Sequence, residues 1–152
     1  MAASSSSSAR AAWRDDPSSR AAMRFGWAAA SAFLFFGIGL ELLHFVKAPF
    51  YVDVHMRREM WTLAHAHGVL IALFTIVYAA IAPGVVPRAT ARVRASWLLR
   101  IGALLVPVGF LAGGVGSAEG DPSLGIVLVP IGATLVLLAF LLVAQAVWME
   151  KS

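Results

Sequence analysis

The sequence contains no cysteine, and only 13% of its 152 residues are charged. The absence of cysteine excludes disulfide bonds, zinc ribbons, iron–sulfur clusters and thiol chemistry. A soluble domain carries about a quarter charged residues, and a small domain buries only about two thirds of the surface that its unfolded chain exposes. Because 60% of the residues are hydrophobic, one soluble core of this size cannot hide them. The composition predicts an integral membrane protein.

Motifs of nucleotide-binding and hydrolytic enzymes are also missing from the sequence. It has no G-x-S-x-G elbow, no Ser/His/Asp arrangement and no glycine-rich phosphate loop. The net charge of +4 comes without a basic stripe interleaved with aromatic residues. We therefore predict neither nucleophilic hydrolysis nor a nucleic acid partner.

Four apolar runs are long enough to cross a lipid bilayer as helices, which takes roughly 20 residues each. They cover approximately residues 27–46, 61–82, 97–116 and 124–148. The alternating apolar and polar pattern of a membrane β-barrel is absent from these runs. The sequence predicts an all-α fold, a four-helix transmembrane bundle formed by residues 24–152.

Residues 1–23 have a different composition from the rest of the chain. Five consecutive serines are followed by scattered arginine and alanine, with no apolar period. We predict a disordered cytoplasmic tail; the alternatives are an organelle transit peptide or a true start at Met23. Asp15 and Asp16 argue against a transit peptide, because such peptides are poor in acidic residues.

Basic residues are distributed unequally between the two sides of the predicted bundle. Only Lys47, Arg57 and Arg58 lie on the side that holds the loop after the first span. The side that holds both termini carries nine, namely Arg10, Arg14, Arg20, Arg24, Arg88, Arg92, Arg94, Arg100 and Lys151. Since basic residues accumulate on the cytoplasmic side, the sequence predicts a multi-pass protein whose N- and C-termini are both cytoplasmic.

All four histidines lie in the outer half of the predicted bundle, together with several carboxylates. These residues are Glu41 and His44 at the end of the first span, His55 and Glu59 in the loop, and His65 and His67 at the start of the second span. Ionisable groups within a membrane are costly and often mark function. The alternative is that they are interfacial residues joined by hydrogen bonds, and we expect Glu41 to bond to His44 or to another outer-half group.

Helical geometry separates the two histidines of the second span. Its small residues Ala64, Gly68, Ala72, Thr75 and Ala79 define one face, and Leu63, Leu70, Phe74, Val77 and Ile81 define a bulky, lipid-facing one. His65 lies about 60° from the centre of the small face and His67 about 100° from it. His65 is therefore predicted to face inward, whereas His67 lies nearer the bulky side and is a candidate for contact with a neighbouring subunit. Because about 200° separate them, they cannot bind one ion together.

The first span has a narrow seam of small and polar residues. Glu41 and His44 are about 60° apart on a helix and share a face with Ala30 and Gly37. Glu41 and His44 also have the Glu-x-x-His spacing of di-iron bundles, but the third and fourth spans supply no second motif. A proton relay through Glu41, His44 and His65 has no continuation toward the cytoplasmic side.

A haem group needs only one axial imidazole, so the outer cluster is sufficient for that cofactor. The candidate cofactor-binding residues are His65, His44, His67 and Glu41. The alternative is a non-catalytic four-span protein whose histidines are structural or interfacial.

The motif Trp61-Thr62-Leu63-Ala64-His65, which opens the second of four spans, resembles that of styrene oxide isomerase and hydroxylaminobenzene mutase-like membrane proteins. The resemblance implies a helical bundle that forms homo-oligomers. In the isomerase branch it also implies a haem b whose iron is held by the histidine matching His65. That iron acts there as a Lewis acid on the epoxide oxygen of a small apolar substrate.

Two positions depart from the pattern of that family. The family has an asparagine six residues after the histidine, where this chain has Ile71, and the isomerases have a tyrosine after a stretch similar to Val108-Gly109-Phe110, where this chain has Leu111. The resemblance therefore favours haem binding over epoxide isomerisation, and the reaction itself is not carried over.

Overall fold

The computed structural model describes residues 12–116 and 121–149. Its long helices are α2 (Pro17–Phe45), α4 (His55–Val85), α5 (Ala89–Gly113) and α6 (Leu128–Met149), with a short α3 (Pro49–Val52) and a 3₁₀ turn η1 (Leu124–Val127). Four segments are long and apolar enough to cross a membrane, the last one being Leu124–Met149. The predicted all-α four-helix fold is confirmed, and no strand occurs in the described part of the chain.

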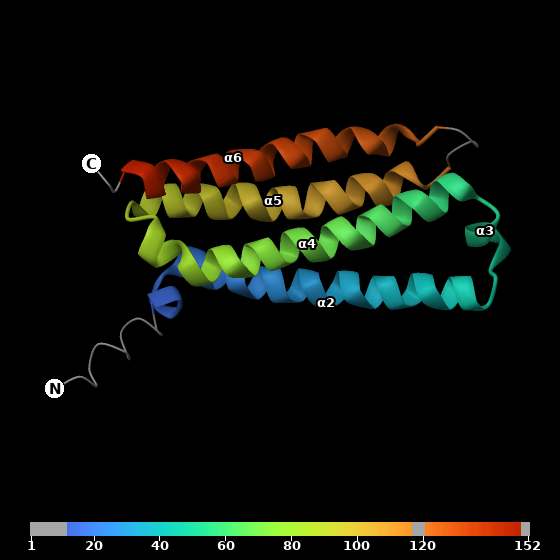
Figure 1. The fold of residues 1–152 in the computed structure, drawn as a ribbon, viewed down its shortest axis with the longest axis horizontal. Helices are drawn as coiled ribbons and strands as arrows, with labels where there is room; N and C mark the ends of the chain where they lie inside the picture. Colours follow the sequence, from blue (N-terminus) through green and yellow to red (C-terminus); the bar gives the residue numbers. More distant parts are fainter. Residues whose placement is uncertain (1–11, 117–120, 150–152) are drawn as a thin grey trace.

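The long helices lie side by side in the order α2, α4, α5 and α6, and each runs antiparallel to the one before it (Figure 1). The start of α2, the end of α6 and the α4–α5 connection lie at one end of the bundle, called here the terminal end (Figure 1). The short helix α3 lies at the opposite end, called here the α3 end. Consecutive helices therefore make most of the interhelical contacts.

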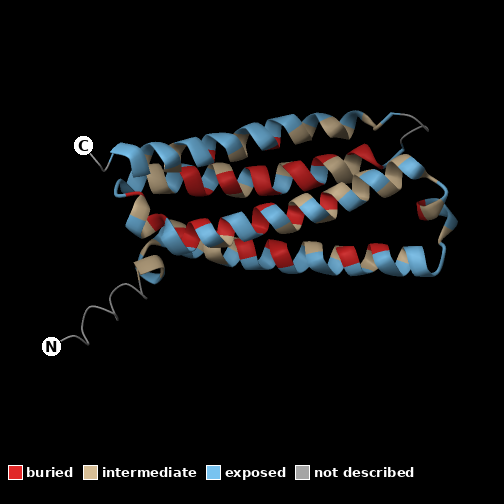
Figure 2. Cartoon of the chain, in the orientation of Figure 1, coloured by how far each residue is buried: buried red, intermediate tan, exposed pale blue. Residues whose placement is uncertain are grey.

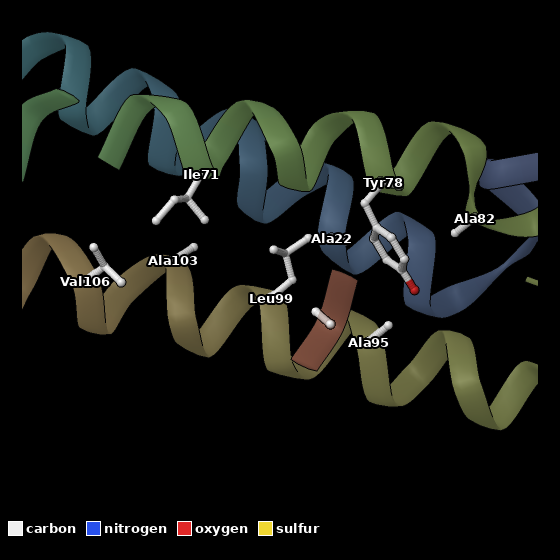
Figure 3. Packing of buried hydrophobic residues seen from close by; sticks show 10 residues of the cluster. Ala22, Ile71, Tyr78, Ala82, Ala95, Leu99, Ala103 and Val106 are labelled. Atoms are coloured by element: carbon white, nitrogen blue, oxygen red, sulfur yellow. The ribbon is translucent and has the colours of Figure 1, made fainter. Parts of the chain in front are cut away.

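The buried positions of α2, α4 and α5, red in Figure 2, are mostly occupied by small residues. On α4 the predicted small face is buried throughout, and of the predicted bulky face four residues are exposed and Leu63 is half-buried. The core joins Ile71 and Tyr78 of α4 to Leu99 and Val106 of α5 and to Ala22 of α2 (Figure 3). Because small side chains let helix backbones approach closely in lipid, the size pattern along α4 sets its orientation in the bundle.

Helix α6 packs on α5 with few fully buried residues, through half-buried side chains such as Val129 and Val136. Only Gly132 and Ala139 of α6 are buried. A Cβ atom placed on Gly132 would lie 2.8 Å from the backbone nitrogen of Val106, and one placed on Gly102 would lie 2.8 Å from the carbonyl oxygen of Gly132. Close backbone approach at these glycines holds α6 against α5, and its other faces present apolar side chains suited to lipid.

The first helix begins earlier than the sequence pattern predicts. Asp16 caps α2 by accepting a hydrogen bond from the Ser19 backbone N–H at 2.8 Å, and Pro17 occupies the first turn. Ser19 and Ala22 are fully buried. The predicted disordered tail of residues 1–23 is therefore wrong for residues 17–23, which the cap and the packing hold in α2. Residues 12–15 form a further helical turn, and residues 1–11 lie outside the described part of the chain.

Arg92 joins three helices at the terminal end. Its Nε donates to Asp16 Oδ1 at 3.2 Å, and its Nη1 donates to the carbonyl oxygens of Val86 at 2.8 Å and Pro87 at 3.0 Å. The Tyr78 hydroxyl donates to the Arg92 carbonyl at 2.7 Å, and Figure 3 shows Tyr78 extending from α4 toward α5. We call Asp16, Tyr78 and Arg92 the polar lock, because they tie the start of α2 to the end of α4 and the start of α5.

The carboxylate of the polar lock is stabilised in its charged form. Burial alone would raise the pKa of Asp16, but hydrogen bonds from the Ser18 hydroxyl and from Ser19, together with the charge of Arg92, lower it below the usual value of 3.8. The Ser96 hydroxyl adds a bond to the Ser18 carbonyl at 3.2 Å. The polar lock thus depends on an ionised Asp16.

Candidate functional site

An open groove of about 670 Å³ lies between α2 and α4 at the α3 end. It is lined by Gly37, Leu40, Glu41, His44, Tyr51, Arg58, Glu59, Thr62, Leu63 and His65. Three of the four predicted site residues, Glu41, His44 and His65, line this groove, and His67 does not. Gly37, Glu41 and His44 form the seam predicted for the first span.

His65 faces α2, and one of its ring nitrogens is fixed by the backbone of that helix. Its Nδ1 lies 2.8 Å from the Phe33 carbonyl oxygen. Because a carbonyl can only accept, Nδ1 carries the proton and donates, which leaves a lone pair on Nε2 of the neutral ring. Within the described ranges Nε2 has no hydrogen-bond partner. His65 therefore lines the groove with Nε2 as the ring nitrogen that no described residue engages in a hydrogen bond.

Gly37 allows the His65 ring to lie directly against α2. A Cβ atom at Gly37 would lie 2.3 Å from Cε1 and 2.4 Å from Nδ1 of the ring. The arrangement is reciprocal, since a Cβ atom at Gly68 of α4 would lie 2.3 Å from Cγ of Phe33. Each helix thus inserts one ring over a glycine of the other, and this interlock sets the orientation of His65.

Replacing Gly37 by alanine should displace the His65 ring and break its bond to Phe33. We expect a loss of about 2 kcal/mol in the free energy of unfolding, because overpacking and a lost hydrogen bond outweigh the better helix propensity of alanine. Gly39→Ala is the matched control, since nothing lies within 4 Å of its Cβ position. That control should be neutral or up to about 1 kcal/mol stabilising. Thermal unfolding in detergent measures both, and equal effects would contradict the interlock.

Glu41 and His44 reach the groove as exposed side chains. The expected bond from Glu41 to His44 is not formed, and no hydrogen bond or ion pair to Glu41 occurs among the residues that the structure describes. His44 instead packs edge-on against Tyr51, with ring centroids 6.2 Å apart, and Tyr51 stacks on Trp61 at 6.0 Å. Both polar groups are therefore free to contact a ligand at the mouth of the groove.

The donor set of the groove fits a single-histidine site better than a carboxylate-rich one. Within residues 12–116 and 121–149, no group of three or more His, Cys, Asp or Glu side chains could hold a metal ion. A di-iron centre needs several carboxylates as well as histidines, and the Glu41 and His44 pair has no second motif beside it. An axial imidazole at His65 needs no such cluster.

His67 contacts α5 and is half-buried. Its ring lies 5.0 Å from the Phe110 ring, centroid to centroid, and its Nδ1 lies 3.0 Å from the Leu63 carbonyl of its own helix. Helix α5 packs against the flank of α4 on which His67 lies, and the predicted contact of His67 with a neighbouring subunit stays a prediction. The two histidines nevertheless face different helices, as their separation of about 200° requires.

Sequence reasoning missed Tyr51, Arg58 and Thr62 as groove residues. Arg58, Thr62 and His65 have i, i+4 and i+7 spacing, which places them on one helix face and is a signal visible in the sequence. The Arg58 guanidinium donates to the Val52 carbonyl at 3.2 Å. This bond holds α3 beside α4 and sets a positive charge on the groove wall.

Comparison with protein-family models, with curated proteins and with solved structures finds no match to this chain. The interpretation of the groove therefore depends on the geometry of its own residues. The implied kinship with the isomerase and mutase-like proteins stays a prediction.

Proposed function

We propose that this integral membrane protein binds haem b in the groove between α2 and α4, with His65 Nε2 as the axial ligand. The observation that carries the proposal is the Nδ1 bond to the Phe33 carbonyl at 2.8 Å, beside a groove of about 670 Å³. Metal-binding histidines almost always donate their other ring N–H in this way, which fixes the tautomer and the ring orientation.

The groove residues fit such a group in several ways. Leu40 and Leu63 form an apolar part of the groove wall, which suits a hydrophobic macrocycle. The Arg58 guanidinium is suited to pair with a carboxylate of the ligand. When bound, haem supplies an iron that acts as a Lewis acid or a redox centre. Glu41 and His44, which are exposed at the groove, are placed to accept or donate protons there.

The proposal covers cofactor binding and leaves epoxide isomerisation aside. The two positions that lack the polar residues of the family do not line the groove: Ile71 is buried in the core with α5, and Leu111 accepts a hydrogen bond from Trp61 through its backbone carbonyl. A small apolar substrate and homo-oligomerisation enter the proposal only through the resemblance. Crosslinking in native membranes checks the oligomer.

The proposal also places both termini in the cytoplasm. Arg20 and Arg24 lie near the start of α2, and Arg88 and Arg94 lie near the start of α5, so these cations belong to the terminal end. Basic residues favour the cytoplasmic side. The groove then opens on the outer half of the bilayer.

A visible absorption spectrum tests the cofactor directly. Full-length protein purified in detergent from haem-replete cells should show a Soret band, and its pyridine adduct should have the spectrum of b-type haem. The same protein from haem-deficient cells should lack the band and serves as the control. Colourless protein from haem-replete cells would contradict the proposal.

A second candidate is a non-catalytic four-span protein in which His65 is a structural tie. The bond from His65 to Phe33 favours it, because that bond joins α4 to α2 whether or not a ligand is present. The two candidates differ in whether Nε2 is needed, and variants at position 65 separate them.

A further inference from the structure

A second groove, of about 540 Å³, lies between α5 and α6 at the terminal end. It is lined by Val93, Arg94, Trp97, Leu98, Leu138, Leu141, Leu142 and Gln145. The four α6 residues have the i, i+3, i+4 and i+7 spacing of one helix face, and they span about 10 Å along the axis. The groove thus has an apolar floor several side chains long and polar residues, Arg94 and Gln145, at its mouth.

Among the described residues that line this groove, the one charged side chain is the cation Arg94. Arg94 and Arg100 of α5, and Arg88 just before that helix, form no ion pair with any described residue, in contrast to Arg92, which is paired with Asp16. No acidic side chain lines the groove. The exposed Trp97 lies between two of these cations, and the Arg100 guanidinium sits 4.2 Å from the centroid of its ring. A cationic mouth over an apolar floor is complementary to an amphiphile with an anionic head.

We infer that this groove binds one anionic phospholipid. The Arg94 guanidinium contacts the phosphate, because its planar donors match phosphate oxygens, and the amide of Gln145 donates a hydrogen bond to the headgroup. An acyl chain lies along Leu98, Leu138 and Leu141. Basic pockets between membrane helices bind anionic headgroups by this combination of charge and apolar surface. The inference is independent of the haem proposal, since the two grooves share no residue.

The test is native mass spectrometry of the full-length protein in neutral detergent, titrated with dioleoylphosphatidylglycerol or dioleoylphosphatidylcholine. Wild-type protein should retain phosphatidylglycerol in preference to phosphatidylcholine. Arg94→Gln should weaken the binding of phosphatidylglycerol about fivefold, as expected for one cation near a phosphate. Arg24→Gln is the matched control, because it removes the same charge from an exposed position on α2 that lines neither groove. The control should change binding by less than about twofold.

A groove-filling variant separates the lipid from a headgroup or a free anion. Leu141→Trp keeps Arg94 but fills the apolar floor of the groove, so this variant should also release phosphatidylglycerol. Inorganic phosphate should compete poorly with phosphatidylglycerol for the wild-type protein. Equal losses in Arg94→Gln and Arg24→Gln would overturn the site in favour of diffuse charge. The site would also be overturned if Leu141→Trp retained phosphatidylglycerol, or if wild-type protein bound phosphatidylcholine equally well. Thermal unfolding of each variant confirms that it is folded.

Discussion

Arg92→Ala should lower the free energy of unfolding by about 3 kcal/mol, the largest stability loss that we expect from one substitution in this chain. The Arg92 and Asp16 side chains are 16% and 12% exposed, so removal of the guanidinium leaves the Asp16 carboxylate mostly buried without its cation. It also removes the donors to the carbonyls of Val86 and Pro87. Thermal or denaturant unfolding in detergent measures the loss.

Arg88→Ala is the control for that substitution. Arg88 is exposed, only four residues away and in no ion pair within the described ranges, so its loss should change stability by less than about 0.5 kcal/mol. Arg92→Lys keeps the charge but lacks the planar fork, so it should give an intermediate loss. Equal stability of Arg92→Ala and Arg88→Ala would show that the polar lock contributes nothing.

The polar lock also predicts how stability depends on pH. Because folding lowers the pKa of Asp16 below 3.8, its carboxylate stabilises the fold at pH values above the unfolded pKa. That contribution is lost as pH falls through the lower, folded pKa. Wild-type protein should therefore lose stability below about pH 4, and Asp16→Asn should lack this part of the acid transition. An acid transition of equal size in both proteins would assign it to other groups.

The four helices and the faces of α4 could be predicted because membrane length and residue size are local properties of a sequence. The start of α2 could not be read from hydropathy, since Arg20 and Arg24 lower it there. The Asp16-Pro17 pair is a helix-start signal in the sequence, and it marks the observed boundary. Burial of Ser19, whose hydroxyl has no hydrogen-bond partner among the described residues, depends on packing between helices that no local pattern reports.

The candidate site shows the same division between local and tertiary information. Periodicity predicted the seam of Gly37, Glu41 and His44 and the inward direction of His65. It could not say that α2 would cover one flank of α4 and α5 the other, so the packing of His67 on Phe110 could not be predicted. The place of Tyr51 in the groove could not be predicted for another reason. Tyr51 lies on α3, a short helix within the loop between two spans, and it lines the groove from there.

Substitutions at positions 65 and 67 should affect a bound haem very differently. His65→Ala removes the axial imidazole and should abolish the Soret band or shift it strongly, because this bond is the main attachment of the iron to the protein. His67→Ala removes a ring that packs on Phe110 away from the groove, so the band should keep its position and most of its intensity. Absorption spectra at equal protein concentration measure both.

His65→Asn separates ligation from folding. The asparagine amide can occupy the place of Nδ1 and donate to the Phe33 carbonyl, but it offers nothing in the place of Nε2. Under the haem proposal this variant should unfold at nearly the wild-type temperature of haem-free protein and yet lose the Soret band as completely as His65→Ala. If the asparagine variant keeps the band, Nε2 is not the ligand. If His67→Ala alone loses it, the haem lies against α5, and the groove between α2 and α4 is not its site.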